Sequence, residues 1–343
     1  MTSTSRPPSI WQRSAAKAVL ATSLVLALGA GVTLWRASVR EAVAVANYPP
    51  QGQFLEVTGE QVHVLDLGQP AGWSSDAPAP DLVLIHGASG HIRDMSFRLA
   101  PALRDRYRIV IVDRPGLGYS SRADHTGASL AEQARLIRGA VAQLDVRAPI
   151  VLGQSYGGGV ALAWALDAPG SLSALVTVGG VSHPWPTPLS RFYKITSSPL
   201  GQALVVPLLT AFVPRQTIRD TLTEVFEPQP VPEGYFDHFG PGLTLRRSAM
   251  RANALQRANL LAEITAMAPR YPALRLPIEA VHGSADTTVS LDLHARQLER
   301  DAQAVNLTVL DGIGHMPHQV ATEAVAAAVD RAAERAAAQA RLR

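Results

Sequence analysis

Six short apolar runs, separated by segments long enough for helices, recur along most of this 343-residue chain. Each run has the length of a strand and too few polar residues to form a solvated face. Runs of this kind suit a parallel sheet that is covered on both faces by helices. The pattern therefore predicts an α/β fold. The six runs are Leu82–Ile85, Ile109–Val112, Ile150–Leu152, Ala174–Val178, Ile278–Val281 and Leu307–Leu310.

Two further strands are predicted before this series, at Phe54–Val57 and Gln61–Leu67, with a turn between them. One long interruption, residues 183–276, breaks the alternation of strands and helices and contains twelve prolines and many aromatic residues. The predicted helices are His91–Arg104 with a break at Pro101, Ser129–Leu144, Ser155–Leu166, Leu291–Asp301 and Thr322–Ala338.

The N-terminal region contains an apolar run of a different length. Ala18–Trp35 comprises 18 residues without a charge, and as a helix it would extend about 27 Å, close to the thickness of a bilayer core. Arg13 and Lys17 precede it, and Arg36 and Arg40 follow it. The run predicts a single transmembrane helix. Its positively charged N-terminal side favours a cytoplasmic tail and a body on the extracytoplasmic side.

A cleaved signal peptide followed by secretion is the alternative. The candidate small-residue cleavage sites, Ala42-Val43-Ala44 and Ala44-Val45-Ala46, lie well beyond the apolar run and behind two arginines, which favours an uncleaved anchor. A buried helix of a soluble domain is disfavoured, because only three residues of the run are polar, too few for a solvated face. These are Thr22, Ser23 and Thr33.

The charge distribution argues against a nucleic-acid partner. The formal net charge is +3, but residues 1–40 hold five basic residues and no acidic one. The rest of the chain carries 26 basic and 28 acidic residues and is close to neutral, so no nucleic-acid binding is expected. The sequence contains no cysteine, which excludes disulfides, thiolate metal sites and a cysteine nucleophile.

The motif Gly153-Gln154-Ser155-Tyr156-Gly157 follows one predicted strand directly and opens a predicted helix. A sharp strand-turn-helix connection forces the central serine into a strained backbone conformation, and the flanking glycines allow the strand and the helix to approach closely. The hydroxyl group then lies at a helix N-terminus, whose dipole favours developing negative charge. Ser155 is therefore the candidate nucleophile.

A serine hydroxyl group needs a base and a group that orients the base. Asp286 follows the strand Ile278–Val281, and His315 lies in the loop after the last strand. Because the carboxyl ends of parallel strands share one edge of a sheet, Ser155, Asp286 and His315 are expected to meet there as nucleophile, acid and base. At the same edge, the backbone N–H groups of Ala88 and Tyr156 are predicted to hold an oxyanion.

These residues carry a resemblance to a known superfamily. Residues 54–340 resemble the α/β-hydrolase fold in its serine-nucleophile branch. The matching features occur in the order typical of that superfamily: His86-Gly87, the elbow Gly153–Gly157, Asp286 and His315. The loop Asp113–Gly118 is similar to the family's Asp-x-x-Gly-x-Gly loop. The resemblance implies a mostly parallel eight-stranded sheet with helices on both faces. It divides the chain into 1–46 (cytoplasmic tail, anchor and linker), 47–182 (first core part), 183–276 (helical lid) and 277–343 (second core part).

The other polar residues near the strand ends receive structural roles. Asp113 is interpreted as a hydrogen-bond acceptor that shapes its loop, and His86 and His282 as structural histidines. His315 and His318 are three residues apart, but no further metal ligand clusters with them, so no metal is expected and His318 is interpreted as lining the site. Other predicted substrate contacts are Ser89, Tyr193 and Phe236.

The resemblance implies a hydrolase that needs no cofactor and acts on a small hydrophobic carbonyl compound, with a carboxylic ester as the first expectation. A carbon–carbon bond hydrolase, a lactonase and a cofactor-free haloperoxidase use the same triad and remain alternatives. A serine nucleophile separates the chain from relatives with an aspartate nucleophile, the haloalkane dehalogenases and epoxide hydrolases. The alternative of another class is a catalytically silent binding protein on the same fold.

Overall fold

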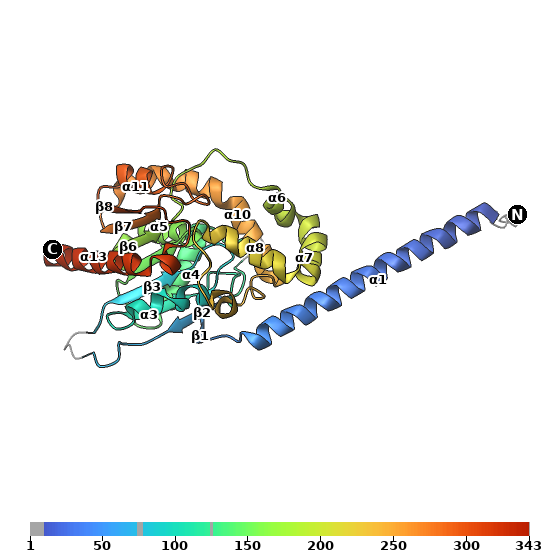
Figure 1. Ribbon diagram of the computed structural model, residues 1–343, viewed down its shortest axis with the longest axis horizontal. Helices are drawn as coiled ribbons and strands as arrows, with labels where there is room; N and C mark the ends of the chain where they lie inside the picture. Colours follow the sequence, from blue (N-terminus) through green and yellow to red (C-terminus); the bar gives the residue numbers. More distant parts are fainter. Residues whose placement is uncertain (1–9, 74–77, 124–125, 343) are drawn as a thin grey trace, which may run out of the picture.

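The structure is a computed structural model that describes residues 10–73, 78–123 and 126–342, and its centre is one eight-stranded sheet (Figure 1). The strand order is β1-β2-β4-β3-β5-β6-β7-β8, with β2 antiparallel to β1 and β4 and all other neighbours parallel. The predicted α/β class and mostly parallel sheet are confirmed. The strands are β1 Gln53–Val57, β2 Glu60–Asp66, β3 Asp81–Ile85, β4 Arg108–Val112, β5 Ile150–Gln154, β6 Ala174–Val178, β7 Ile278–Gly283 and β8 Val305–Leu310.

Helices cover both faces of the sheet, which explains why its central strands are apolar throughout. Within β3, Val83 and Ile85 contribute to one buried cluster, and Leu82 and Leu84 to another on the opposite face. The first cluster is completed by α4 Leu130–Ala142, α5 Tyr156–Asp167 and α11 Ala295–Asp301, the second by α2 Ile92–Phe97, α3 Leu99–Leu103 and α13 Thr322–Arg341. Two short elements, η1 Pro169–Ser171 and α12 Pro317–Val320, complete the core.

The helix predicted at His91–Arg104 is broken at a different residue from the one expected. The chain leaves helical geometry at Arg98, between α2 and α3, and Pro101 lies inside α3. A proline is tolerated in the first turn of a helix, where its missing N–H group has no intrahelical acceptor to lose. The proline therefore marks the beginning of a new helix rather than the break itself.

The segment between β6 and β7, called the insertion here (residues 183–276), is helical. It lies over one end of the core, and its helices occupy the right-hand side of the body in Figure 1. Its elements are α6 Arg191–Ser197, the π-helical turn η2 Gly201–Val205, α7 Val206–Phe212, α8 Arg215–Phe226, α9 Tyr235–Phe239, α10 Arg247–Met267 and η3 Ala268–Ala273.

The N-terminal helix α1, Ile10–Asn47, extends well beyond the predicted apolar run and projects away from the body (Figure 1). Its 38 residues correspond to about 57 Å. One 32-residue stretch, Ala16–Asn47, is long and apolar enough to cross a membrane, a property that N-terminal signal sequences share. The helix ends at Asn47, next to the predicted boundary between residues 1–46 and the first core part. Residues 1–9 of the predicted tail, with Arg6, lie outside the described residues.

The C-terminal part of α1 is packed against the insertion rather than free. Arg36 Nε donates to the carbonyl oxygen of Ala211 at 2.8 Å, and a guanidinium nitrogen of Arg40 donates to that of Val213 at 3.0 Å. These carbonyl groups lie at the C-terminal end of α7, where no intrahelical donor reaches them and the helix dipole favours positive charge. Both arginines that follow the apolar run therefore fix the helix to the body.

Candidate active site

Ser155 occupies the connection between β5 and α5, and its backbone is strained as the motif predicts. Its φ angle is 52° and its ψ angle −116°, a conformation that L-residues rarely adopt. The amide of Ser155 donates to Val178 at 2.9 Å, and its carbonyl oxygen accepts from Val181 and Gly158. A methyl group on Gly153 would collide with the backbone of Gly157. The surroundings thus hold the strained turn in place.

The three predicted triad residues meet at the carboxyl edge of the sheet. His315 Nε2 lies 2.9 Å from Ser155 Oγ, and His315 Nδ1 lies 2.7 Å from Asp286 Oδ2. Ser155 and His315 are both buried, and the carboxylate of Asp286 is inaccessible to solvent. Each residue follows a different strand, β5, β7 or β8, so the parallel sheet sets their spacing. The arrangement can move a proton from the hydroxyl group to the imidazole ring.

Asp286 is held as a carboxylate. Its Oδ1 accepts hydrogen bonds from the amides of Thr288 and Val289, each at 2.8 Å, and His282 Nε2 lies 3.3 Å from its Oδ2. Burial alone would raise the pKa of Asp286, but the hydrogen bonds from His282 and His315 outweigh it and hold the pKa well below its usual value. Asp286 is therefore ionised throughout the neutral range. The interpretation of His282 as a structural histidine agrees with its bond to Asp286 and its burial.

The two amides predicted to hold an oxyanion lie on either side of the elbow. Tyr156 is the first residue of α5, where an N–H group has no intrahelical acceptor, and Ala88 follows β3, the neighbour of β5. A methyl group on Gly157 would collide with the carbonyl oxygens of Ile85 and His86, so the elbow and the β3 loop are in direct backbone contact. Among the hydrogen bonds of the described residues, neither amide has an acceptor. Both N–H groups thus remain available to a ligand.

Two of the predicted substrate contacts are joined by a residue that the sequence did not single out. Asn253 of α10 accepts from the amide of Ser89 at 2.9 Å and donates to the hydroxyl group of Ser89 at 2.9 Å. Its amide nitrogen also lies 3.5 Å from the hydroxyl group of Tyr193 in α6. Ser89 has a φ angle of 53° and directly follows Ala88, so Asn253 fixes the loop beside one oxyanion candidate.

The other two predicted contacts have different neighbours. Phe236 lies half-buried in α9, with the guanidinium group of Arg219 3.9 Å from its ring centre. His318 is completely buried, and its Nε2 lies 3.2 Å from both carboxylate oxygens of Asp94. In this conformation the His318 side chain offers no surface to a substrate, and its ring contacts the buried carboxylate of Asp94 instead. Although His315 and His318 are only three residues apart, their rings have different partners: His315 contacts Ser155, and His318 contacts Asp94.

Asp94 is the centre of a network that joins the core to the insertion. Its carboxylate accepts from the hydroxyl group of Tyr235 in α9 at 2.7 Å and from the side-chain amide of Gln319 at 3.0 Å. Burial acts to raise the pKa of Asp94, but His318 and these hydrogen bonds lower it to about 2. The network is entirely buried, so removing one of its hydrogen-bonding groups lowers the free energy of unfolding.

Replacing Asp94 with asparagine is expected to lower the stability of the fold most strongly near neutral pH. Because the folded-state pKa lies below the unfolded one, the carboxylate stabilises the fold above about pH 4, and this contribution is lost as the pH falls towards 2. The Asp94→Asn variant should lose about 2 kcal/mol or more at pH 7. Urea unfolding at pH 7, 4 and 3 measures this, and equal destabilisation at all three values would contradict it.

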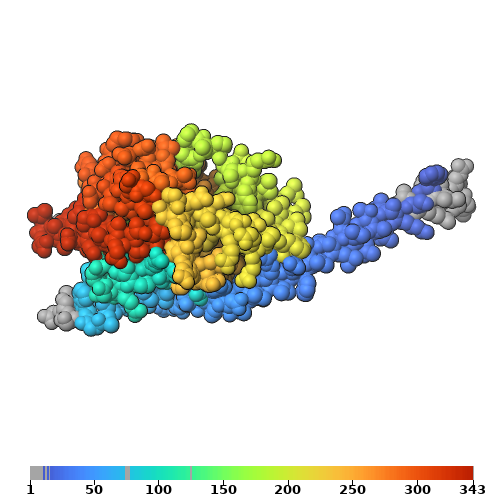
Figure 2. Space-filling view, viewed as in Figure 1, coloured from blue at the N-terminus to red at the C-terminus, as the bar shows by residue number. Residues whose placement is uncertain are grey.

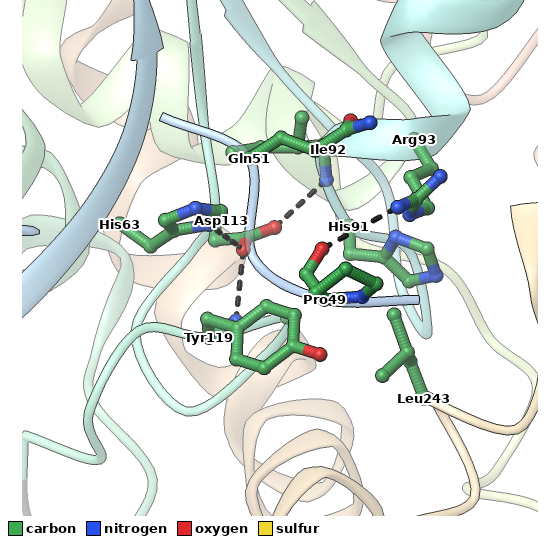
Figure 3. A pocket seen from close by; sticks show the side chains of 10 residues that line it. Pro49, Gln51, His63, His91, Ile92, Arg93, Asp113, Tyr119 and Leu243 are labelled. Carbon is green, nitrogen blue, oxygen red and sulfur yellow. Dashed lines mark hydrogen bonds and ion pairs between the residues drawn. The ribbon is translucent and has the colours of Figure 1, made fainter. Parts of the chain in front are cut away.

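A separate small hollow surrounds Asp113, and Figure 3 shows the side chains that line it. Asp113 accepts from the amides of Ile92 at 2.7 Å and Tyr119 at 2.8 Å, and His63 Nδ1 lies 2.6 Å from its carboxylate. Burial would raise the pKa of Asp113, but the bond to His63 keeps it below its usual value. Asp113 thus fixes two loops, which confirms its predicted role. The hollow does not include the triad.

His86 has the structural role that was predicted for it. Its Nε2 accepts from the amide of Arg114 at 3.0 Å, and its other nitrogen lies 2.9 Å from the carbonyl oxygen of Gly87. Burial and the nearby Arg114 lower the pKa of His86 to about 3, so the ring is neutral. Within the described ranges, no group of three or more histidine and carboxylate side chains has the arrangement of a metal site.

Comparisons with known proteins agree with this architecture. A family profile described as "alpha/beta hydrolase fold" matches residues 80–201. Over 129 residues the chain is 33% identical to a dihydrolipoyllysine-residue acetyltransferase component of an acetoin cleaving system from Cupriavidus necator, covering 38% of this chain and 32% of that protein. It is also 33% identical over 147 residues to a 2-hydroxy-6-oxononadienedioate/2-hydroxy-6-oxononatrienedioate hydrolase from Escherichia coli O81, covering 39% and 48%. The matches thus span about a third of the first relative and about half of the second.

Solved structures extend the likeness over most of the chain. An esterase from Exiguobacterium antarcticum superposes with a TM-score of 0.64 at 18% identity, covering 82% of this chain and 98% of that one. A likeness at this identity establishes the fold. With the eight-stranded sheet, the profile match and the solved structures in agreement, the chain has the α/β-hydrolase fold.

Proposed function

We propose that this protein is a serine hydrolase that cleaves a carboxylic ester. The observation that carries the proposal is the unbroken series of contacts from Ser155 through His315 to Asp286, at distances of 2.9 and 2.7 Å, on a strained elbow. Strain at a turn of this kind persists only when the surrounding structure enforces it, and it exposes the hydroxyl group to a ligand. The fold and the esterases among the structural relatives agree with this chemistry.

The proposed reaction proceeds through an acyl-enzyme. Ser155 Oγ attacks the carbonyl carbon while His315 Nε2 takes its proton, and Asp286 holds the imidazolium ring in place. The amides of Ala88 and Tyr156 stabilise the oxyanion of the tetrahedral intermediate. His315 then protonates the departing alcohol. Water, activated by the same histidine, attacks the acyl-enzyme and releases the acid and the free serine.

The helix α1 is proposed to anchor the enzyme in a membrane with residues 183–276 as the lid above the site. The candidate signal-cleavage sites support retention of α1, because they lie within its helical, packed part. Ala44 is buried, and a methyl group on Gly242 would approach its Cβ to 3.0 Å. Cleavage there would also remove the ion pair between Glu41 and Arg247, at 2.7 Å. An extracytoplasmic body remains the preferred orientation.

A carbon–carbon bond hydrolase is the second candidate, because a relative with that printed activity shares 33% identity over 147 residues. The two reactions are distinguished by assaying the full-length protein in detergent with p-nitrophenyl esters of increasing acyl length and with a vinylogous diketone acid. Turnover of esters without loss of the diketone's absorbance supports the proposal. The reverse selectivity would overturn it in favour of carbon–carbon cleavage. Inactivity on every substrate of a folded protein would favour the silent binding protein.

A further inference from the structure

An apolar arm, formed by α6, η2 and α7 (residues 191–212), carries the most hydrophobic surface of the body. The stretch from 195 to 214 contains no charged residue. Six large apolar side chains of the arm are between 45% and 75% exposed. A surface with several neighbouring exposed apolar side chains of this kind marks an interaction site. The six are Phe192, Ile195, Leu200, Leu204, Leu208 and Phe212.

The arm has an inward face that fixes it to the body, so its outward face is a regular part of the fold. Thr196, Val206 and Thr210 are buried, and the hydroxyl group of Thr210 donates to the carbonyl oxygen of Leu245 at 2.8 Å. Arg251 of α10 donates to the carbonyl oxygen of Gln202 at 3.0 Å. The chain bends by 91° between α6 and the helix formed by η2 and α7. This bend presents one apolar edge to the outside.

The arm is continuous with the surface of the proposed anchor. The guanidinium group of Arg36 lies 5.1 Å from the ring centre of Phe212, in addition to its bond to Ala211. Figure 1 shows α6 and α7 at the end of the body from which α1 projects, and Figure 2 shows α1 leaving beside the same region. Arg36 is also the first charge after the apolar run. When α1 spans a bilayer, the arm therefore lies where the helix leaves it.

The charges around the arm complement a lipid surface. Residues 168–219 contain no acidic residue, whereas Arg191, Lys194 and Arg215 are exposed at the two ends of the arm. Basic side chains at this position attract anionic headgroups, while the apolar side chains between them enter the headgroup and acyl boundary. A surface for a soluble protein partner would not need to lie next to the proposed membrane helix α1.

The inner face of α6 connects this surface to the catalytic loop. Tyr193 lies next to the outward-facing Phe192 and points to Asn253, which in turn holds Ser89 beside Ala88. We infer that the apolar arm lies in the membrane interface next to α1 and that the substrate is a long-chain ester dissolved in the bilayer. This inference rests on the proposed anchor and on the proposed ester hydrolysis, and it adds where the substrate comes from.

A fluorescent label tests the position of the arm without any activity measurement. The chain has no cysteine, so a Leu204→Cys variant of the full-length protein takes one nitrobenzoxadiazole label. The Leu342→Cys variant is the control, at the exposed C-terminal end opposite the arm (Figure 1). Each is placed at one copy per nanodisc of phosphatidylcholine and phosphatidylglycerol, with or without doxyl-labelled lipid.

The expected result is blue-shifted emission and quenching by doxyl lipid for the Leu204→Cys label and neither for the Leu342→Cys label. A Leu204→Cys label that behaves as in water would overturn the inference. So would a Leu204→Cys label with blue-shifted emission that doxyl lipid does not quench, because protein rather than lipid would then cover the arm.

The source of the substrate is tested by two esters. The Leu200→Glu/Leu204→Glu variant should lose about tenfold or more of the turnover of 4-methylumbelliferyl oleate held in vesicles and keep the rate on soluble p-nitrophenyl butyrate within about twofold. The Leu342→Glu variant should keep both rates. An equal loss of turnover on both esters, or a loss on neither, would overturn the inference that the substrate is dissolved in the bilayer. Inactivity of the unmodified protein on both would instead refute ester hydrolysis, while the label still decides where the arm lies.

Discussion

The Ser155→Ala variant is expected to lose ester turnover by at least about 10⁴-fold in kcat, with little change in stability. Only the proposed nucleophilic oxygen is removed, and the two amides proposed to hold the oxyanion remain. The backbone at this position already has a φ angle of 52° with a side chain that bears a Cβ atom. Alanine therefore adds little strain to that already present. Steady-state kinetics on a p-nitrophenyl ester and a thermal melt measure the two quantities.

The control for Ser155→Ala is Ser120→Ala, another buried serine whose hydroxyl group donates to the backbone of Asp113 at 2.7 Å rather than to His315. It should lose stability and keep most of its kcat. Comparable activity of the Ser155→Ala variant and the unmodified protein would show that the hydroxyl group of Ser155 is not the nucleophile.

The Asp286→Asn variant is expected to lose about 10⁴-fold in kcat, because the asparagine cannot hold the imidazolium ring. The carboxylate accepts from His315 Nδ1 at 2.7 Å, and its lowered pKa keeps it charged at every assay pH. An amide group in its place offers an N–H donor to Nδ1 and favours the wrong tautomer. The oxygen that accepts from Thr288 and Val289 is retained, so the loop keeps its shape.

A matched Asp→Asn substitution outside the triad serves as the control for the loss of the Asp286 charge. Asp311 lies in the next loop and bonds to the exposed Ser284, so the Asp311→Asn variant should keep its activity. If the Asp286→Asn variant retained more than about a tenth of the unmodified kcat, the orientation of His315 would have to depend on another group. The near neighbour His282 would then be the first residue to test.

The sheet and the three triad positions were predictable from the sequence for one physical reason. Strands buried on both faces are apolar throughout, and Ser155 and Asp286 lie just beyond the ends of two such strands, β5 and β7. His315 lies in the loop after β8, the partly exposed edge strand. Glycine at 153 and 157 marked the close approach that the elbow requires. In these cases a local sequence pattern identifies the strand and the residue after it, and the topology of a parallel sheet brings those residues to one edge.

The residues that the sequence did not reveal are those whose role depends on distant partners. Asn253 lies in the middle of a helix, and only the packing of α10 beside the β3 loop brings it to Ser89. His318 lies three residues after His315, a spacing that by itself does not tell a site residue from a structural one. Its role depends on the buried Asp94, which is 224 residues away in the sequence. The docking of the C-terminal part of α1 on the insertion, through Arg36, Arg40 and Glu41, depends in the same way on tertiary contacts.

The most direct test of the proposed active site is the intact mass of the full-length protein after treatment with a fluorophosphonate, beside its Ser155→Ala variant. The full-length chain is needed because α1 bonds to the insertion through Arg36, Arg40 and Glu41. One adduct on the unmodified protein and none on the variant is the predicted result, because only an activated serine reacts readily. An adduct of equal extent on both proteins, or none on the folded unmodified protein, would contradict the assignment of Ser155 as the nucleophile.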